Sequence, residues 1–154
     1  MTSCGIQTNT DQIVPTWNLY SNLHYKISLY YPKDWESINV ERYEGEDGFF
    51  QIGAISGKDL SIDQIADDNA FHKLKPYGDD PQINELEIDG QEARLIYPSA
   101  DQPEEMQNQA ALIVKHPTGI EIDNNIYYYI ILWADKDHIE QIGRNLTFID
   151  ESSE

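Results

Sequence analysis

The stretch NNIYYYIILWA, residues 124–134, is apolar on both faces when it is drawn as a β-strand. Successive side chains point to opposite faces of a strand. One face would carry Ile126, Tyr128, Ile130 and Leu132, and the other Tyr127, Tyr129, Ile131 and Trp133. A strand without a polar face is typically central and covered on both sides. We therefore expect a layered fold in which helices cover at least one face of a sheet.

Residues 59–75, DLSIDQIADDNAFHKLK, give the strongest helix signal in the chain. Ser61 and Gln64 have the spacing of a capping box, in which each side chain bonds the other residue's backbone N–H. Apolar residues then recur at helical spacing as far as Leu74, and Pro76 would end the helix. A second helix is predicted within residues 135–149, where Ile139, Ile142 and Leu146 share a face and Asp135 or Asp137 could cap the start.

Four further segments predict strands. They are residues 24–31, residues 49–55, the hairpin of residues 84–98 and residues 110–116. Asp89 and Gly90 are a type I′ turn pair, because both central positions of that turn need positive φ. Gly53, inside a strand, indicates a bulge or the close approach of another backbone. The fold class expected from these elements is α+β: a central, mostly antiparallel sheet of about six strands with two main helices packed on it.

The chain of 154 residues has the length of one domain. Residues 1–16 are mostly polar and cannot bury enough surface to offset the entropy of ordering them, so we expect a flexible tether. Residues 17–150 would form the folded domain, and residues 151–154 a frayed tail. No apolar run approaches the roughly 20 residues that a membrane-spanning helix requires.

The chain carries 28 acidic and 10 basic residues, a net charge of −18. Proteins bind phosphate backbones with lysine and arginine, so nucleic acid is not an expected partner. Anionic headgroups would also repel this surface, and any membrane contact is expected through a lipid anchor alone. High negative charge serves solubility in many proteins, although a cationic partner or a divalent metal remains open.

The order of elements resembles the PsbP-like (Mog1/PsbP/DcrB) superfamily. The resemblance starts with YSNLHYKISLYYPKDW, a strand that ends in Tyr-Pro and is followed by Trp35, and it covers residues 19–149. It continues through LSIDQIADDNAFHKLK, ELEIDGQEARLIY, two long strands and HIEQIGRNLTFI. The resemblance implies a sandwich of sheet and helices and a mostly non-enzymatic role, often as a bacterial envelope lipoprotein.

Cys4 is the chain's single cysteine, in the context MTSCG. Thr2, Ser3 and Gly5 suit the small positions of a lipobox, in which the cysteine thiol is acylated, whereas Met1 stands where leucine is usual. Acyl chains contribute about 0.8 kcal/mol per buried methylene, so two or three would anchor the domain. We expect lipid attachment at Cys4 and a place in the cell envelope; if Met1 is the initiator, the protein is cytosolic with a reduced thiol.

No catalytic or metal-binding motif is present. The four histidines are far apart in sequence, and the acidic pairs lack the alternating ligands of a calcium loop. We therefore expect no catalytic residues, no metal ligands and no cofactor. Tyr30, Trp35 and Tyr31 are candidates for an exposed aromatic surface that grips a partner.

These observations favour a non-catalytic envelope domain that binds or assembles with a protein partner. The alternative is a carrier of a small ligand or a metal, with a pocket between sheet and helix. An exposed apolar patch would favour the first, and a cavity with convergent polar groups the second. The oligomeric state is left open.

Overall fold

The apolar stretch is the central strand of the larger of two antiparallel sheets. The structure is a computed structural model, and it describes residues 17–149. In spatial order, the seven strands of this sheet are β3 (Glu36–Asn39), β4 (Arg42–Gly45), β5 (Gly48–Ile55), β9 (Asn125–Asp135), β8 (Gln109–Ile122), β7 (Gln91–Tyr97) and β6 (Gln82–Ile88). The prediction of a central strand buried on both faces is confirmed for Ile130, Ile131 and Leu132, which are all buried, whereas Ile126 and Tyr128 at the start of the strand are exposed.

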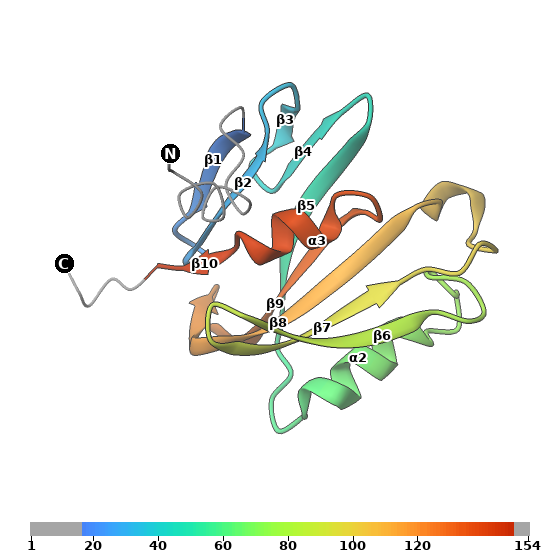
Figure 1. Ribbon diagram of the computed structural model, residues 1–154. Helices are drawn as coiled ribbons and strands as arrows, with labels where there is room; N and C mark the ends of the chain where they lie inside the picture. Colours follow the sequence, from blue (N-terminus) through green and yellow to red (C-terminus); the bar gives the residue numbers. More distant parts are fainter. Residues whose placement is uncertain (1–16, 150–154) are drawn as a thin grey trace, which may run out of the picture.

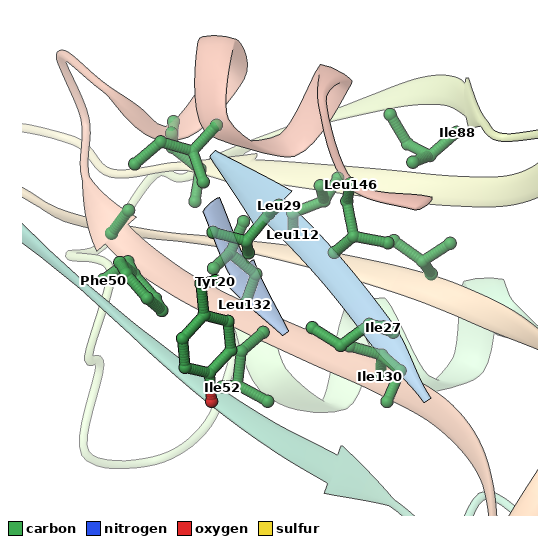
Figure 2. Close-up of a cluster of buried hydrophobic side chains, with 14 of the residues drawn as sticks. Tyr20, Ile27, Leu29, Phe50, Ile52, Ile88, Leu112, Ile130, Leu132 and Leu146 are labelled. Carbon is green, nitrogen blue, oxygen red and sulfur yellow. The ribbon is translucent and has the colours of Figure 1, made fainter. Parts of the chain in front are cut away.

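A smaller sheet and a short helix cover one face of the larger sheet (Figure 1). The small sheet has the order β1 (Trp17–Asn22), β2 (Ile27–Pro32), β10 (Thr147–Phe148), and the helix is α3 (Ile139–Arg144). Figure 2 shows the core between the two sheets, with Ile27 and Leu29 of β2 directed toward Ile130 and Leu132 of β9. These four side chains are completely shielded from solvent.

The helix α2 (Ile62–Ala70) lies on the opposite face of the larger sheet, beside β7 and β8 (Figure 1). Its start is the predicted capping box: the Ser61 hydroxyl accepts from the backbone N–H of Gln64 at 3.1 Å, and the Gln64 side chain accepts from the backbone N–H of Ser61 at 2.9 Å. The second core cluster lies beneath this helix and includes Ile62, Ile65 and Ile131. The larger sheet is therefore the middle of three layers.

The expected α+β fold with two main helices on a sheet of about six strands is wrong. The described residues form a mostly-β protein with a three-stranded and a seven-stranded sheet. Both predicted helices are shorter than expected. α2 ends at Ala70, because Phe71 leaves the helical conformation at φ −111° and ψ 28°, and the chain then turns, with the Lys75 N–H donating to the His72 carbonyl at 2.8 Å before Pro76.

The second predicted helix ends at Arg144, and the chain then returns to an extended conformation. Thr147 pairs with Ser28 and Phe148 with Ile27, which forms β10 where residues 135–149 predicted helix throughout. The predicted caps are also wrong, since the N-cap residue is His138 and no side chain caps the helix. Apolar spacing alone did not reveal that Phe148 packs against the core as part of a strand.

The strand predicted at residues 24–31 begins later and follows a turn. Lys26 has φ 58°, and the Asn22 side chain accepts hydrogen bonds from the backbone of His24 and Tyr25, which closes the turn between β1 and β2. Besides β10, three strands were missed: β1, β3 and β4. Strands β3 and β4 are short and largely exposed, so they show no apolar alternation.

The hairpin and the 49–55 strand agree with the sequence. Asp89 and Gly90 have φ 49° and 81° and join β6 to β7, as a type I′ turn requires. Gly53 of β5 does not mark a bulge, because the β5–β9 ladder runs through it without interruption. A Cβ built on Gly53 would lie 3.0 Å from Cζ3 of Trp133, so the glycine makes room for an indole ring.

The predicted tether of residues 1–16, Cys4 within it and the predicted tail of residues 151–154 lie outside the described residues. Among residues 17–149, no helix is long and apolar enough to cross a membrane.

Candidate ligand pocket

The helix α2 covers only part of its face of the larger sheet, and a pocket lies on the part that it leaves open. The cross-strand register places Arg42 of β4, Gln51 of β5, Trp133 of β9 and Ala111 of β8 in one row. Ala111 of this row is buried in the cluster beneath α2. Arg42, Gln51 and Trp133 stay partly exposed and form the floor of the pocket.

The walls come from two segments that follow regular elements. One is the end of α2 and the turn after it, and the other is the loop that leads into β8. The pocket has a volume of about 350 Å³. Its lining consists of Arg42, Gln51, Asn69, His72, Leu74, Pro76, Tyr77, Met106, Gln109 and Trp133.

Two aromatic side chains are fixed against each other in this pocket. The indole Nε1 of Trp133 donates to the Tyr77 hydroxyl at 3.2 Å. Tyr77 is buried, and burial raises the pKa of its hydroxyl to about 12, so the phenol is neutral at physiological pH. The described residues give this phenol no acceptor of its own for its proton.

Arg42 supplies the permanent positive charge of the lining. Its Nε donates to Glu44 at 2.9 Å, and its Nη1 donates to the side-chain oxygen of Gln51 at 3.0 Å. The guanidinium carbon also lies 4.4 Å from the centre of the Phe49 ring, a cation–π contact. Three neighbours therefore orient the guanidinium, while Nη2 and one N–H of Nη1 take part in neither hydrogen bond.

A buried amide fastens the two walls together. Nε2 of Gln102 donates to the carbonyl of Pro76 at 3.0 Å and to the carbonyl of Gln109 at 2.9 Å. Its Oε1 accepts from the backbone N–H of Asn108 at 2.9 Å. Gln102 is only 7% exposed, so these bonds replace water at a desolvated amide.

A second set of bonds holds the chain just beyond Tyr77. The backbone N–H of Ser99 donates to the Tyr77 carbonyl at 2.9 Å, and the Ser99 hydroxyl donates to Asp101 at 2.6 Å. Asp101 also accepts from the backbone N–H of Asp79 at 3.1 Å. The Ser99 bond, with the backbone bond, lowers the pKa of Asp101 to about 2. Together these contacts keep the Tyr77 ring at a defined place in the wall.

The three aromatic residues predicted to form an exposed surface do not do so. Trp35 is 3% exposed and Tyr31 is 8% exposed, and only Tyr30 is partly accessible. The Trp35 indole donates to Asp47 at 2.8 Å and lies edge-on to the His138 ring. The prediction of exposure is wrong for Tyr31 and Trp35, because the face of β2 that carries Tyr31 packs against the larger sheet and Trp35 folds under the β4–β5 turn.

Titratable groups elsewhere do not form a metal site in the described part of the chain. Among residues 17–149, no three or more histidine, cysteine, aspartate or glutamate side chains are grouped so that they could hold a metal ion. His138 contacts Asp135 at 2.8 Å and approaches Asp47 at 3.7 Å, and these two contacts hold the turn before α3 against the β4–β5 turn.

None of the pocket residues was selected from the sequence. The segment FHKLKPYG, residues 71–78, is predicted as the end of a helix, and the polar loop SADQPEEMQNQ, residues 99–109, has no periodic signal. The row from Arg42 to Trp133 depends on the pairing of β4, β5 and β9, which sequence spacing does not give.

Comparison with known proteins adds no relative to this picture. No family model matches the chain, and no curated protein matches it. The resemblance to the PsbP-like superfamily therefore stays a prediction, and the pocket has to be interpreted from its own chemistry.

Proposed function

We propose that this chain is a binding protein for a small, polar, ring-containing molecule, which it holds in the pocket above Trp133. Ligand sites in proteins are typically concave, with apolar or aromatic surfaces and a few polar groups that fix orientation, and have volumes of about 300–1,000 Å³. A pocket of about 350 Å³ suits a molecule built on a single ring.

The observation that carries this proposal is the combination of Trp133 with the polar groups around it. Aromatic rings stack on the rings of ligands, while the side chains of Gln51, Asn69, His72 and Gln109 offer hydrogen bonds around the same space. The walls are fastened by Gln102, so the site exists before a ligand arrives. Such preorganisation lowers the entropic cost of binding.

Other roles have less support in the described residues. The large exposed apolar side chains are distributed over separate segments, with Leu19 and Leu23 near β1, Ile38 and Val40 around the β3–β4 turn, and Phe71 and Leu74 after α2. A catalytic pocket would need a nucleophile or an acid–base pair. His72 and Tyr77 are the lining groups that could move a proton, and burial raises the pKa of Tyr77 to about 12; the lining includes no serine, threonine, cysteine, lysine, aspartate or glutamate, which favours binding over chemistry.

The proposal can be tested by nuclear magnetic resonance on the protein in solution. A library of single-ring compounds, with neutral, cationic and anionic members, would be added to ¹⁵N-labelled protein. We expect at least one member to shift the indole N–H signal of Trp133 and the side-chain amide signals of Gln51 and Asn69. Trp133→Ala should abolish binding of that compound.

Trp17→Ala is the matched control, because Trp17 lies in β1, outside the pocket lining. Its binding should equal that of the parent protein. The proposal fails if no compound perturbs the pocket signals, or if the perturbed signals cluster elsewhere and survive Trp133→Ala.

The place of the protein in the cell is a separate proposal that rests on Cys4 alone. Acylation of this cysteine would hold the domain at a membrane of the cell envelope, where it could meet an envelope partner. Cys4→Ser in the full-length precursor should move the protein from the membrane fraction to the soluble fraction. Unchanged partitioning would contradict lipid attachment and would leave the ligand proposal untouched.

A further inference from the structure

We infer that the ligand carries a carboxylate, which the free edge of the Arg42 guanidinium binds while the ring of the ligand lies on Trp133. This inference rests on the proposed function and specifies the chemical class of the molecule.

The first argument is the charge of the lining. The chain has 28 acidic residues, yet none of them lines this pocket. Arg42 is the permanently charged group in the lining. Glu44 lies outside the lining and accepts from Nε of Arg42 at 2.9 Å, on the edge of the guanidinium nearest the backbone. Glu44 already pairs with Nε of Arg42, so an anionic ligand would gain the remaining charge-assisted N–H groups of the guanidinium, whereas a cationic ligand would find no carboxylate in the lining.

The second argument is the balance of donors and acceptors. The Gln51 oxygen is occupied by Arg42, so its NH₂ group is the part left for a ligand. The Tyr77 hydroxyl accepts from Trp133 and keeps its own proton. These groups join the remaining Nη protons of Arg42 as donors. A carboxylate only accepts hydrogen bonds, so it matches the Gln51 NH₂ group and the remaining Arg42 N–H groups; the Asn69 oxygen, whose amide nitrogen donates to the Ile65 carbonyl, is an acceptor left for a polar group on the ring.

The third argument is geometry. Neighbouring strands of a sheet lie about 4.8 Å apart, so β4 and β9, which flank β5, are separated by about 10 Å. Arg42 and Trp133 occupy the same row across these strands. A ring centred on Trp133 therefore has room for a carboxylate one or two bonds from the ring, directed along the row toward Arg42. The terminal N–H groups of arginine suit both oxygens of such a carboxylate.

Two sources share this chemistry, an aromatic acid and a sugar acid, since either ring can lie on an indole. The test uses two matched pairs of probes: phenylacetate with phenylacetamide, and glucuronate with glucuronamide. Each amide keeps the ring and removes the charge. Affinities would be measured by following the Trp133 indole signal during titration of the parent protein.

We expect the acid of at least one pair to bind about 10- to 100-fold more tightly than its amide, because hydrogen bonds to charged groups are stronger than neutral ones. The pair that shows this preference identifies the ring type. Arg42→Gln should bring acid and amide to equal affinity. Arg144→Gln removes the same charge from α3, where the arginine pairs with Glu140 outside the pocket, and should keep the preference.

Equal affinity of acid and amide in both pairs would overturn this inference and leave the proposed function standing. The same holds if none of the four probes shifts the Trp133 signal while other library compounds do. An acid preference that persists in Arg42→Gln would also overturn it. If that variant does not fold, the comparison of acid with amide in the parent protein decides. The proposed function itself is contradicted if no single-ring compound perturbs the pocket signals, or if the perturbed signals lie elsewhere and survive Trp133→Ala.

Discussion

The two faces of the larger sheet are covered to different extents. On one face the small sheet and α3 cover a core that includes residues of β5, β7, β8 and β9. On the other face α2 has nine residues, about 13 Å of helix, on a sheet whose outer strands are roughly 29 Å apart. One helix of this length covers β7 and β8 and leaves β4 and β5 open. The contrast indicates that the fully covered face contributes most of the stability of the fold. The open part of the other face is then accessible to a ligand.

The largest effect is expected from a charge placed in the covered part of β9. Ile130→Asp puts a carboxylate without a partner between two packed layers, where Ile130 is 0% exposed, and should abolish cooperative folding. Circular dichroism and a thermal melt would show the loss. Ile126→Asp is the same change in the same strand at a position 48% exposed, and this variant should fold. A cooperative melt of Ile130→Asp within a few degrees of the parent would contradict the layered fold.

Two leucine truncations compare the covered core with the pocket rim. Leu132→Ala removes a completely buried side chain and should lower the free energy of unfolding by about 2–5 kcal/mol. Leu74→Ala removes a side chain that is 64% exposed and should change it by less than about 0.5 kcal/mol. Urea denaturation measures both. Equal effects would mean that the two regions do not differ as described.

The pocket wall should depend on the amide that fastens it. Gln102→Ala leaves the carbonyls of Pro76 and Gln109 and the N–H of Asn108 without their partner, and should cost about 1–3 kcal/mol. The variant should also bind ligands more weakly, because the wall is no longer preorganised. Gln82→Ala in the edge strand β6, where the side chain is exposed, should alter neither quantity. Full stability and full binding in Gln102→Ala would show that the wall is held by other contacts.

A smaller effect, which depends on pH, is expected at the end of the covered face. His116 is 4% exposed, and burial, together with the charge of Lys26, lowers its pKa. Its Nδ1 accepts from the backbone N–H of Thr118, so the neutral ring carries its proton on Nε2 and donates to the Tyr25 carbonyl. The unfolded chain thus binds a proton at higher pH than the folded protein does. The free energy of unfolding should be highest above about pH 6.5 and should fall as the pH drops through the pKa of His116 in the folded protein.

The measurement is the free energy of unfolding at several pH values between about 7 and 5. His116→Gln should flatten the decline, while His24→Gln, at an exposed turn, should keep it. A decline of equal slope in His116→Gln would assign the pH dependence to other groups.

The difference between the two faces also explains what the sequence could predict. Patterns among residues close together in the chain were sufficient to predict β9, the capping box of α2 and the turn at Asp89 and Gly90. The fold class was wrong because β1, β3, β4 and β10 were not predicted as strands and both helices are short. Apolar spacing in residues 146–148 is compatible with helix, and only the pairing of Thr147 and Phe148 with β2 shows a strand.

The pocket could not be predicted in the same way, since it joins parts that are distant in the chain. Arg42, Gln51 and Trp133 meet through strand register, and Gln102 meets Pro76 through a loop without regular structure. Of the predicted aromatic residues Tyr30, Tyr31 and Trp35, two are buried: Tyr31 lies on the face of β2 that packs against the larger sheet, and Trp35 lies under the β4–β5 turn. Counting rings in a sequence does not show which of them a second sheet covers.

The most direct measurement is a set of intermolecular nuclear Overhauser effects between the protein and the tightest single-ring ligand found. If the open part of the α2 face is the binding site, ring protons of the ligand will show effects to the Trp133 indole and the Leu74 methyl groups. Effects to Ile38 and Val40, or to Ile126 and Tyr128, without any to Trp133 would place the ligand elsewhere and contradict the account.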